Sequence, residues 1–256
     1  MRMLRLTLAA ALMATSAPLA AGPALAQTIA PEQRSEIERI VHEYIVKNPQ
    51  VLQEAIAALE KQQATADAER QKSAVSENAE TLFNSARHVV IGNPKGDVSL
   101  VEFFDYNCGF CKRSVSDKLK LIEADPNLRV VLKEFPVLGP GSVEAARVAV
   151  AVRMQDKTGE KYLKFHQRMM ANRGQADMAH AIAAAREAGL DVARIKRDIE
   201  GPEVRESLEE SFKLAERLGL NGTPSYVVGE QVVVGAVGVD TLREKVNEAR
   251  CGKTTC

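Results

Sequence analysis

One stretch of the chain constrains the fold more than any other, because it alternates strand-like and helix-like sequence with short links. Residues 98–104 are rich in β-forming side chains, and residues 108–124 have the pattern of a helix that stops at Asp125-Pro126. Residues 129–135 are strand-like again. A strand, a helix and a second strand predict a βαβ unit with parallel strands, and therefore an α/β fold.

The rest of the sequence extends this unit in both directions. Residues 27–86 read as a helical arm with a polar spacer, and residues 87–256 as a second domain that contains the βαβ unit. Within this domain, residues 142–218 are helical throughout, with glycines as punctuation. A β-hairpin at residues 225–234 and a closing helix at residues 239–249 complete the expected order.

The first 26 residues have the three-part pattern of a secretory signal peptide. Two arginines precede an apolar run over residues 6–14, and small residues follow, with cleavage expected after Ala26. A membrane anchor is the alternative, but two prolines and a glycine within residues 18–23 leave too short an apolar stretch to cross about 30 Å of hydrocarbon. We therefore expect an exported, periplasmic protein, in a compartment where disulfides persist.

The composition argues against two classes of protein. The 34 Lys and Arg residues are balanced by 34 Asp and Glu residues, so the chain has no basic surplus to meet nucleic-acid phosphates. Aromatic residues make up 4% of the chain and tryptophan is absent, which argues against a stacking platform for bases. With 45% hydrophobic residues, the chain is not disordered as a whole.

The motif Cys108-Gly109-Phe110-Cys111 lies where the helix of the βαβ unit begins. Cysteines three residues apart lie on one side of the first helical turn, close enough to bridge. Cys108 would meet unpaired backbone N–H groups and the positive end of the helix dipole, which favour a thiolate. We expect Cys108 to be the attacking sulfur and Cys111, one turn further in, to be the shielded resolving thiol.

Two other interpretations of this motif fit less well. A structural disulfide across two intervening residues closes a very small loop and gains little chain entropy. A zinc site needs further ligands, and the other cysteines, Cys251 and Cys256, lie at the far end of the chain. We expect Cys251 and Cys256 to form a local structural disulfide instead. A CxxC motif between a strand and a helix in an exported protein therefore predicts redox chemistry.

An acidic residue, Glu102, interrupts the apolar strand that precedes the motif. It is either an edge-facing surface residue or a buried acid placed to take and return the proton of Cys111. On the next strand, Lys133-Glu134 is a candidate charge partner for Glu102, and the pattern does not decide which of the two faces inward.

The dipeptide Thr223-Pro224 precedes the predicted hairpin. Proline at the start of a strand is sometimes only a device that protects a sheet edge. The alternative is a cis peptide bond between Thr223 and Pro224, which presents the Thr223 backbone to a bound polypeptide.

Together these motifs resemble the DsbA-like branch of the thioredoxin superfamily. The resemblance covers about residues 88–250, and it rests on Cys-Gly-Phe-Cys after Val-Glu-Phe-Phe-Asp-Tyr-Asn, on the helical block, and on Gly-Thr-Pro-Ser-Tyr before a hairpin. It implies a thioredoxin fold with an inserted helical domain at about residues 142–218. It also implies that Cys108 is the nucleophile, Cys111 the resolving cysteine and Glu102 the family's buried acid.

The same resemblance implies where a client polypeptide binds. Thr223 and Pro224 correspond to the cis-proline loop beside the cysteines. We expect these two residues, together with Gly109 and Phe110 between the cysteines, to contact the client. The Gly-Phe dipeptide differs from the Pro-His of the oxidase DsbA, which implies a weaker stabilisation of the thiolate and a less strongly oxidising enzyme.

The segment at residues 27–86 adds a narrower resemblance, to the suppressor-of-copper-sensitivity ScsC proteins. In that group an N-terminal helical segment assembles trimers, and the activity leans towards disulfide isomerisation. The apolar stripes between Ile37 and Leu59 support an assembly role, because short helices with such stripes are not stable alone. Docking of these stripes on the chain's own domain is the alternative. The polar residues 61–80 are expected to act as a spacer.

The sequence therefore predicts a disulfide isomerase that acts on exported client proteins, with a dithiol oxidase of the DsbA type as the second interpretation. A thiol that must be kept reduced implies a membrane thiol reductase of the ScsB or DsbD type as a partner, besides further copies of the chain. We expect no dissociable cofactor and no nucleic acid. A candidate of another class is a copper-tolerance protein, in which reduced Cys108 and Cys111 bind Cu(I).

Overall fold

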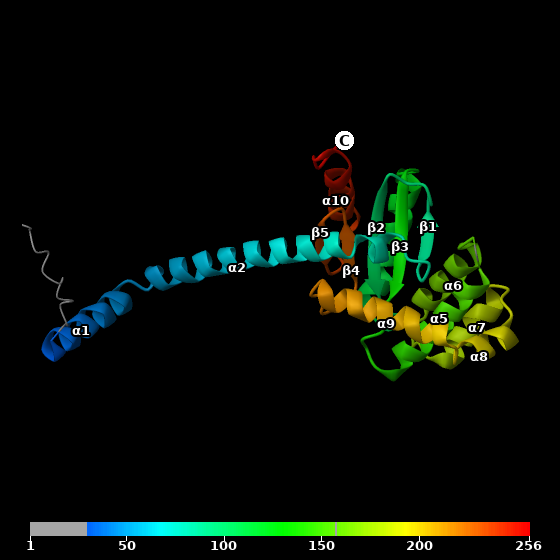
Figure 1. Ribbon diagram of the computed structural model, residues 1–256, viewed down its shortest axis with the longest axis horizontal. Helices are drawn as coiled ribbons and strands as arrows, with labels where there is room; N and C mark the ends of the chain where they lie inside the picture. Colours follow the sequence, from blue (N-terminus) through cyan, green and yellow to red (C-terminus); the bar gives the residue numbers. More distant parts are fainter. Residues whose placement is uncertain (1–29, 157) are drawn as a thin grey trace, which may run out of the picture. The chain divides into compact units, whose positions relative to one another are not determined.

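The computed structural model describes residues 30–156 and 158–256 (Figure 1). These residues form two compact units, the first ending at Ala58 and the second beginning at Leu59. The predicted signal peptide at residues 1–26 lies outside the described residues. In the part of the chain that the structure describes, no helix is long and apolar enough to cross a membrane.

The first unit consists of helix α1 (Pro31–Lys47) and the beginning of helix α2 (Gln50–Glu77), which continues into the second unit. Pro49 separates the two helices, since proline lacks the N–H that a continuing helix needs. Asn48 caps the end of α1, where its side-chain amide donates to the Tyr44 carbonyl at 2.8 Å. No residue of α1 is buried, so its apolar side chains face solvent in the single chain.

The second unit is built on a mixed sheet of five strands in the order β1-β3-β2-β4-β5. These strands are β1 (Val89–Gly92), β2 (Val98–Phe104), β3 (Leu128–Glu134), β4 (Ser225–Val228) and β5 (Gln231–Val234). Strands β2 and β3 are parallel, and the remaining neighbours are antiparallel. The α/β class and the βαβ unit predicted from the sequence are therefore confirmed. The antiparallel pairing of β1 with β3 is an addition that the sequence pattern did not reveal.

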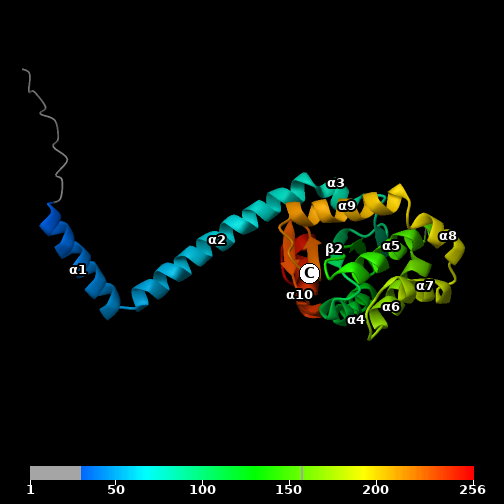
Figure 2. The same ribbon diagram turned by 90° about the horizontal axis from the view of Figure 1, so that it is seen from below.

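Helices cover both faces of this sheet (Figure 2). One face carries α4 (Gly109–Ala124) and α10 (Val239–Cys251), and the other carries α3 (Ala79–Phe83) and α9 (Pro202–Arg217). The helices inserted between β3 and α9 are α5 (Pro140–Gln155), α6 (Glu160–Ala171), α7 (Met178–Glu187) and α8 (Val192–Asp198). This arrangement confirms the predicted thioredoxin fold with an inserted helical domain.

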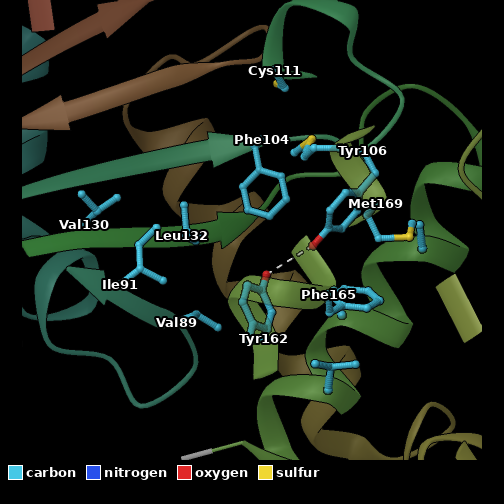
Figure 3. Packing of buried hydrophobic residues seen from close by; sticks show 14 of the residues in the cluster. Val89, Ile91, Phe104, Tyr106, Cys111, Val130, Leu132, Tyr162, Phe165 and Met169 are labelled. Atoms are coloured by element: carbon cyan, nitrogen blue, oxygen red, sulfur yellow. Dashed lines mark hydrogen bonds between the residues drawn. The ribbon is translucent and has the colours of Figure 1, made fainter. Parts of the chain in front are cut away.

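Strand β2 contributes to two hydrophobic clusters, because alternate residues of a strand face opposite sides of the sheet. Leu100 and Phe104 pack on the side of α4, in the cluster drawn in Figure 3. Val101 and Phe103 pack on the side of α9. Helix α4 therefore follows a strand that is buried on both faces, which fixes the position of its first turn.

The segment that leads into the second unit is anchored more firmly than its polar sequence suggests. Val75 and Leu82 are 2% and 0% exposed and belong to the cluster on the α9 side of the sheet. Arg217 donates to the Asn78 side-chain oxygen at 2.6 Å. The end of the predicted spacer is therefore part of the core of the second unit, so a truncation that removes the arm must end before these residues.

Candidate active site

Cys108 occupies the N-cap position of α4, directly after the turn that follows β2. Its backbone is extended, and its sulfur accepts a hydrogen bond from the Cys111 N–H at 3.4 Å. The first N–H groups of a helix have no partner within the helix, and the helix dipole is positive at this end. Both effects favour negative charge on the Cys108 sulfur over charge at any other position of the helix.

A second segment meets Cys108 from the far end of the sequence. Strand β4 pairs with β2, and this pairing brings the Thr223–Pro224 peptide bond, which is cis, beside the cysteine. The Cys108 thiol donates to the Thr223 carbonyl oxygen at 3.1 Å. The structure thus brings together two motifs that lie 115 residues apart in the sequence.

Cys111 differs sharply from Cys108 in its surroundings. Its side chain is fully buried, whereas Cys108 is 5% exposed, so Cys108 alone of the pair reaches the surface. Burial raises the pKa of the Cys111 thiol well above its ordinary value, and the negative charge of Glu102 raises it further. Both cysteines are free thiols. A sulfur that reaches the surface at a helix N-terminus and a fully buried, protonated thiol suit an attacking and a resolving cysteine respectively.

Glu102 is fully buried and lies on the face of β2 that carries α4. Its charge partner is Lys118 of α4, whose ammonium nitrogen lies 2.6 Å from one carboxylate oxygen and 2.5 Å from the other. The expectation that Lys133-Glu134 supplies this partner is wrong, because Lys133 pairs with Glu210 of α9 at 3.1 Å on the opposite face. The surface alternative for Glu102 is excluded by its burial.

Two hydroxyl groups complete the surroundings of this carboxylate. Ser114 donates to Glu102 at 3.4 Å. Tyr226 is the residue opposite Glu102 in the β2–β4 ladder, and its buried hydroxyl has no hydrogen-bond partner among the residues that the structure describes. Burial, and then the charge of Glu102, raises the pKa of Tyr226, so its phenol remains a neutral donor. The sequence did not single out either residue.

A second buried acid, Glu134, is the last residue of β3. The Glu134 carboxylate accepts from the Tyr162 hydroxyl at 2.5 Å and from the Tyr106 hydroxyl at 3.3 Å. His166 is fully buried as well, and its Nδ1 lies 3.3 Å from the Tyr106 hydroxyl. Figure 3 shows the two tyrosine hydroxyls turned toward each other, 3.4 Å apart. Burial raises the pKa of Glu134 well above its usual range, and the hydrogen bonds from the tyrosines only oppose part of this.

Replacement of Glu134 by glutamine should therefore change how stability depends on pH. Between its unfolded pKa of about 4.3 and its raised folded pKa, Glu134 binds more protons in the folded state, so wild-type stability falls as pH rises through this window. Glutamine does not titrate, and it still accepts the bond from Tyr162. We expect the free energy of unfolding of E134Q, relative to that of the wild type, to rise by up to about 1.4 kcal/mol per pH unit within the window.

Urea unfolding from pH 5 to pH 8 measures this difference. The matched control is E123Q, an exposed position at the end of α4 whose curve should run parallel to that of the wild type. Parallel curves for E134Q would contradict the assignment of a protonated carboxyl.

The two residues between the cysteines face outward. Phe110 is 57% exposed, and the Arg113 guanidinium lies 4.3 Å from the centre of its ring, at a distance typical of a cation–π contact. A Cβ at Gly109 would meet only the Arg113 guanidinium, at 3.8 Å, so the surface beside Cys108 is open there. Far from this site, at the end of α10, Cys251 and Cys256 are joined by a disulfide.

Comparison with known families relates this geometry to characterised proteins. A family model of the DSBA-like thioredoxin domain matches residues 99–247. A second family model, the N-terminal domain of the copper resistance protein ScsC, matches residues 33–66. The two models therefore account separately for the catalytic domain and for the arm.

Solved structures give the same relationship. A thioredoxin-like oxidoreductase from Silicibacter pomeroyi DSS-3 is 46% identical, with a TM-score of 0.63, and covers 67% of this chain and 96% of that one. A linker-deletion variant of Proteus mirabilis ScsC is 28% identical, with a TM-score of 0.67, and covers 87% and 97%. A periplasmic thioredoxin-like protein from Salmonella enterica serovar Typhimurium is 28% identical, with a TM-score of 0.59, and covers 67% and 94%.

Among curated proteins, a Na(+)/H(+) antiporter NhaA from Herminiimonas arsenicoxydans is 28% identical over 166 residues, which are 64% of this chain and 26% of the antiporter. The chain thus spans about a quarter of the length of the antiporters that it matches.

Proposed function

Because the chain belongs to the DsbA-like thioredoxin domain family, we propose that it is a thiol–disulfide oxidoreductase that chiefly isomerises disulfides in exported proteins. The observation that carries this proposal is the position of the Cys108 sulfur, within hydrogen-bond distance of both the Cys111 N–H and the Thr223 carbonyl. The first contact stabilises a thiolate. The second offers a backbone edge along which a client strand lies next to the reacting sulfur.

The reaction begins when the Cys108 thiolate attacks one sulfur of a client disulfide. The client S–S bond breaks, a mixed disulfide with Cys108 forms, and the other client sulfur leaves as a thiolate. In isomerisation a different client thiolate attacks the client sulfur of this mixed disulfide. A new client disulfide forms and the Cys108 thiolate returns, with no net change in oxidation state.

Reduction of the client uses Cys111 instead. Its thiol gives up a proton and attacks the Cys108 sulfur, which forms the Cys108–Cys111 disulfide and releases the second client sulfur as a thiolate. The client gains two electrons and the enzyme loses them. We assign to Glu102 the role of proton acceptor for Cys111, since its charge acts on that thiol and its carboxylate is held in place by the ion pair with Lys118. Run backwards, the same steps oxidise a client.

The arm supports isomerisation over simple oxidation. Four apolar side chains of α1 recur at helical spacing and are 48–57% exposed: Ile37, Ile40, Val41 and Tyr44. A stripe of this size is unfavourable in water and is buried if copies of α1 pack together. Assembly places several Cys108 thiols around one misfolded client at high effective concentration, which favours repeated attack on wrong disulfides. A trimer is the assembly that we propose.

Charged substitutions in this stripe should lower isomerisation without lowering the reduction of a small disulfide. We expect the double variant I40D/Y44D to become monomeric and to lose about tenfold in isomerisation, because the effective concentration of neighbouring sites is lost. Reduction of a small disulfide should stay within about twofold, since Cys108 is untouched. Light-scattering mass and reactivation of scrambled ribonuclease measure the two effects.

The matched control is S35D, which adds a charge on the opposite side of α1. An unchanged mass or unchanged isomerisation in I40D/Y44D would refute the assembly argument. A truncated chain that lacks the residues up to Ala58 tests the same assembly argument, because it has lost the stripe of α1 but keeps the buried Val75 in place.

We also propose a periplasmic location. It is supported by the signal-peptide pattern of residues 1–26 and by the likeness to a periplasmic protein from Salmonella enterica. In an oxidising compartment the Cys108 thiol needs a source of electrons if it is to isomerise disulfides. A membrane thiol reductase of the ScsB or DsbD type is therefore the proposed partner.

Client contact is proposed for exposed apolar side chains around Cys108, which we call the apolar rim. It comprises Phe110, Val137, Leu138 and Val143, which are 39–57% exposed. Unfolded clients expose apolar segments, and burial of such segments against the rim would hold a client while its disulfide is attacked.

A second candidate function is Cu(I) handling by reduced Cys108 and Cys111, because the model that matches the arm is named for a copper resistance protein. The ribonuclease assay separates the two. Reactivation that requires Cys108 supports the enzyme, whereas tight Cu(I) binding without reactivation supports the copper function.

A further inference from the structure

The turn between β2 and Cys108 carries two side chains that the reaction does not use. Asp105 is 1% exposed, and one of its carboxylate oxygens accepts from the backbone N–H groups of Val137 and Leu138, at 2.8 and 2.9 Å. Its other oxygen accepts from the Asn107 N–H and the Ser142 hydroxyl, each at 2.7 Å. Four donors satisfy the charged carboxylate, so Asp105 ties this turn to the connection between β3 and α5.

Asn107 ties the same turn to a different part of the inserted helices. Its side-chain NH₂ donates to the Ser142 hydroxyl and to the Ala176 carbonyl, both at 2.9 Å. Its side-chain oxygen accepts from the Ala176 N–H at 2.7 Å. The amide orientation is fixed, because only the oxygen can accept from Ala176. A Cβ at Gly141 would lie 2.7 Å from the Ala176 carbonyl oxygen, so these segments approach closely.

We call the side chains of Asp105, Asn107 and Ser142 the polar clamp. The clamp adjoins the reacting cysteine in the sequence, since Asn107 directly precedes Cys108. The Cys108 N–H also donates to the Asp105 backbone carbonyl at 3.1 Å. The clamp also fixes the backbone at three of the four rim residues. The Val137 and Leu138 N–H groups donate to the Asp105 carboxylate, and Val143 directly follows Ser142, whose hydroxyl donates to the same carboxylate.

The distribution of exposed apolar side chains relates the clamp to client binding. Seven large apolar residues of the second unit are exposed among those described, and four of them form the rim: Phe110, Val137, Leu138 and Val143. Apolar exposure is therefore concentrated around Cys108. The segments that carry Val137, Leu138 and Val143 are fixed by hydrogen bonds to the turn before Cys108.

We infer that Asp105 and Asn107 are positioning residues that hold the apolar rim in place beside Cys108, and that they thereby set a preference for clients with apolar side chains next to the reacting cysteine. The inference rests on the proposed oxidoreductase function and adds a specificity determinant to it. The clamp acts on the binding of the client segment. It does not touch the sulfurs, so exchange with a disulfide too small to reach the rim is independent of it.

The variant N107D tests this with a change of almost no volume. Aspartate keeps the acceptor for the Ala176 N–H but loses both donated bonds, and it places a charged oxygen against the Ala176 carbonyl. We expect KM for a disulfide peptide with leucines beside its cysteines to rise about tenfold, with kcat changed by less than twofold. The rate with oxidised glutathione should change by less than twofold.

The matched control is N93D. Asn93 likewise donates to a backbone carbonyl, that of Pro126, and accepts from a backbone N–H, that of Lys95, but it lies in the turn before β2, at the opposite end of that strand from Cys108. N93D should leave both substrates unaffected. Equal losses with peptide and glutathione in N107D, or an unchanged KM for the peptide, would overturn the inference.

A second variant keeps the inference testable if N107D folds poorly. L138S removes rim surface at a position 53% exposed and leaves every clamp bond in place. It should raise KM for the leucine-flanked peptide in the same direction and leave KM for a serine-flanked peptide unchanged. If L138S raises both equally, the rim has no apolar preference. A wild-type enzyme inactive on both peptides and glutathione would instead contradict the proposed function.

Discussion

Replacement of Cys108 by serine is expected to lower the rate of disulfide exchange at least about a thousandfold, to the rate of the uncatalysed reaction. A serine hydroxyl forms no mixed disulfide, and Cys111 is fully buried and stays protonated, so it does not take over the attack. Initial rates of scrambled ribonuclease reactivation and of insulin reduction by the purified protein measure this loss.

Two other variants show whether the loss belongs to Cys108 alone. C111S should keep the first attack but fail to resolve it, so reduction is lost while mixed disulfides accumulate. The double variant C251S/C256S removes the disulfide at the end of α10 and should leave exchange rates within about twofold, because that disulfide lies far from the site. Substantial activity in C108S would contradict the assignment of the nucleophile.

The largest effect on stability is expected at the buried ion pair. Replacement of Lys118 by methionine keeps the length of the side chain but leaves Glu102 fully buried without its charge partner. Removing one member of a buried pair costs about 3–5 kcal/mol. We therefore expect K118M to lower the free energy of unfolding by this amount in urea titrations at pH 7.

The double variant E102Q/K118M is the decisive control. It removes the charge as well as its partner, and it should recover most of the stability lost in K118M, because no buried charge remains unpaired. It should also slow the resolution step by Cys111, since the proposed proton acceptor is gone. A K118M variant as stable as the wild type would show that water reaches Glu102 and that the pair is not buried in solution.

The sequence predicted the parts of the site that lie within short motifs. The CGFC motif at a helix start and the parallel βαβ unit need only local patterns, and both are present as expected. The pairing partner of Glu102 was missed for a specific reason. The buried side of α4 is formed by Cys111, Ser114, Lys118 and Leu121 at helical spacing, but two of these four residues are polar, so a hydrophobic pattern does not mark this side.

The neighbouring residues Lys133 and Glu134 illustrate a second limit. The question of which one faces inward had no answer in the sequence, and in the structure both are buried because helices cover both faces of β3. Their partners, Glu210 and Tyr162, come from α9 and α6, far along the chain. Only the tertiary arrangement decides such pairs, since alternation along a strand says nothing about what covers each face.

The clamp residues Asp105 and Asn107 were passed over for a related reason. In the sequence they appear as ordinary turn residues before a helix, where Asp and Asn are common. Their long-range bonds to Leu138 and Ala176 depend on how the inserted helices return to the sheet.

The most direct test of the account is intact-protein mass spectrometry of the C111S variant after brief mixing with a disulfide-bonded client. The account predicts one adduct with the added mass of the client, reversed by dithiothreitol, and a protease digest that places the link at Cys108. An adduct at Cys251 or Cys256, or no adduct under conditions in which the wild type reactivates ribonuclease, would contradict it.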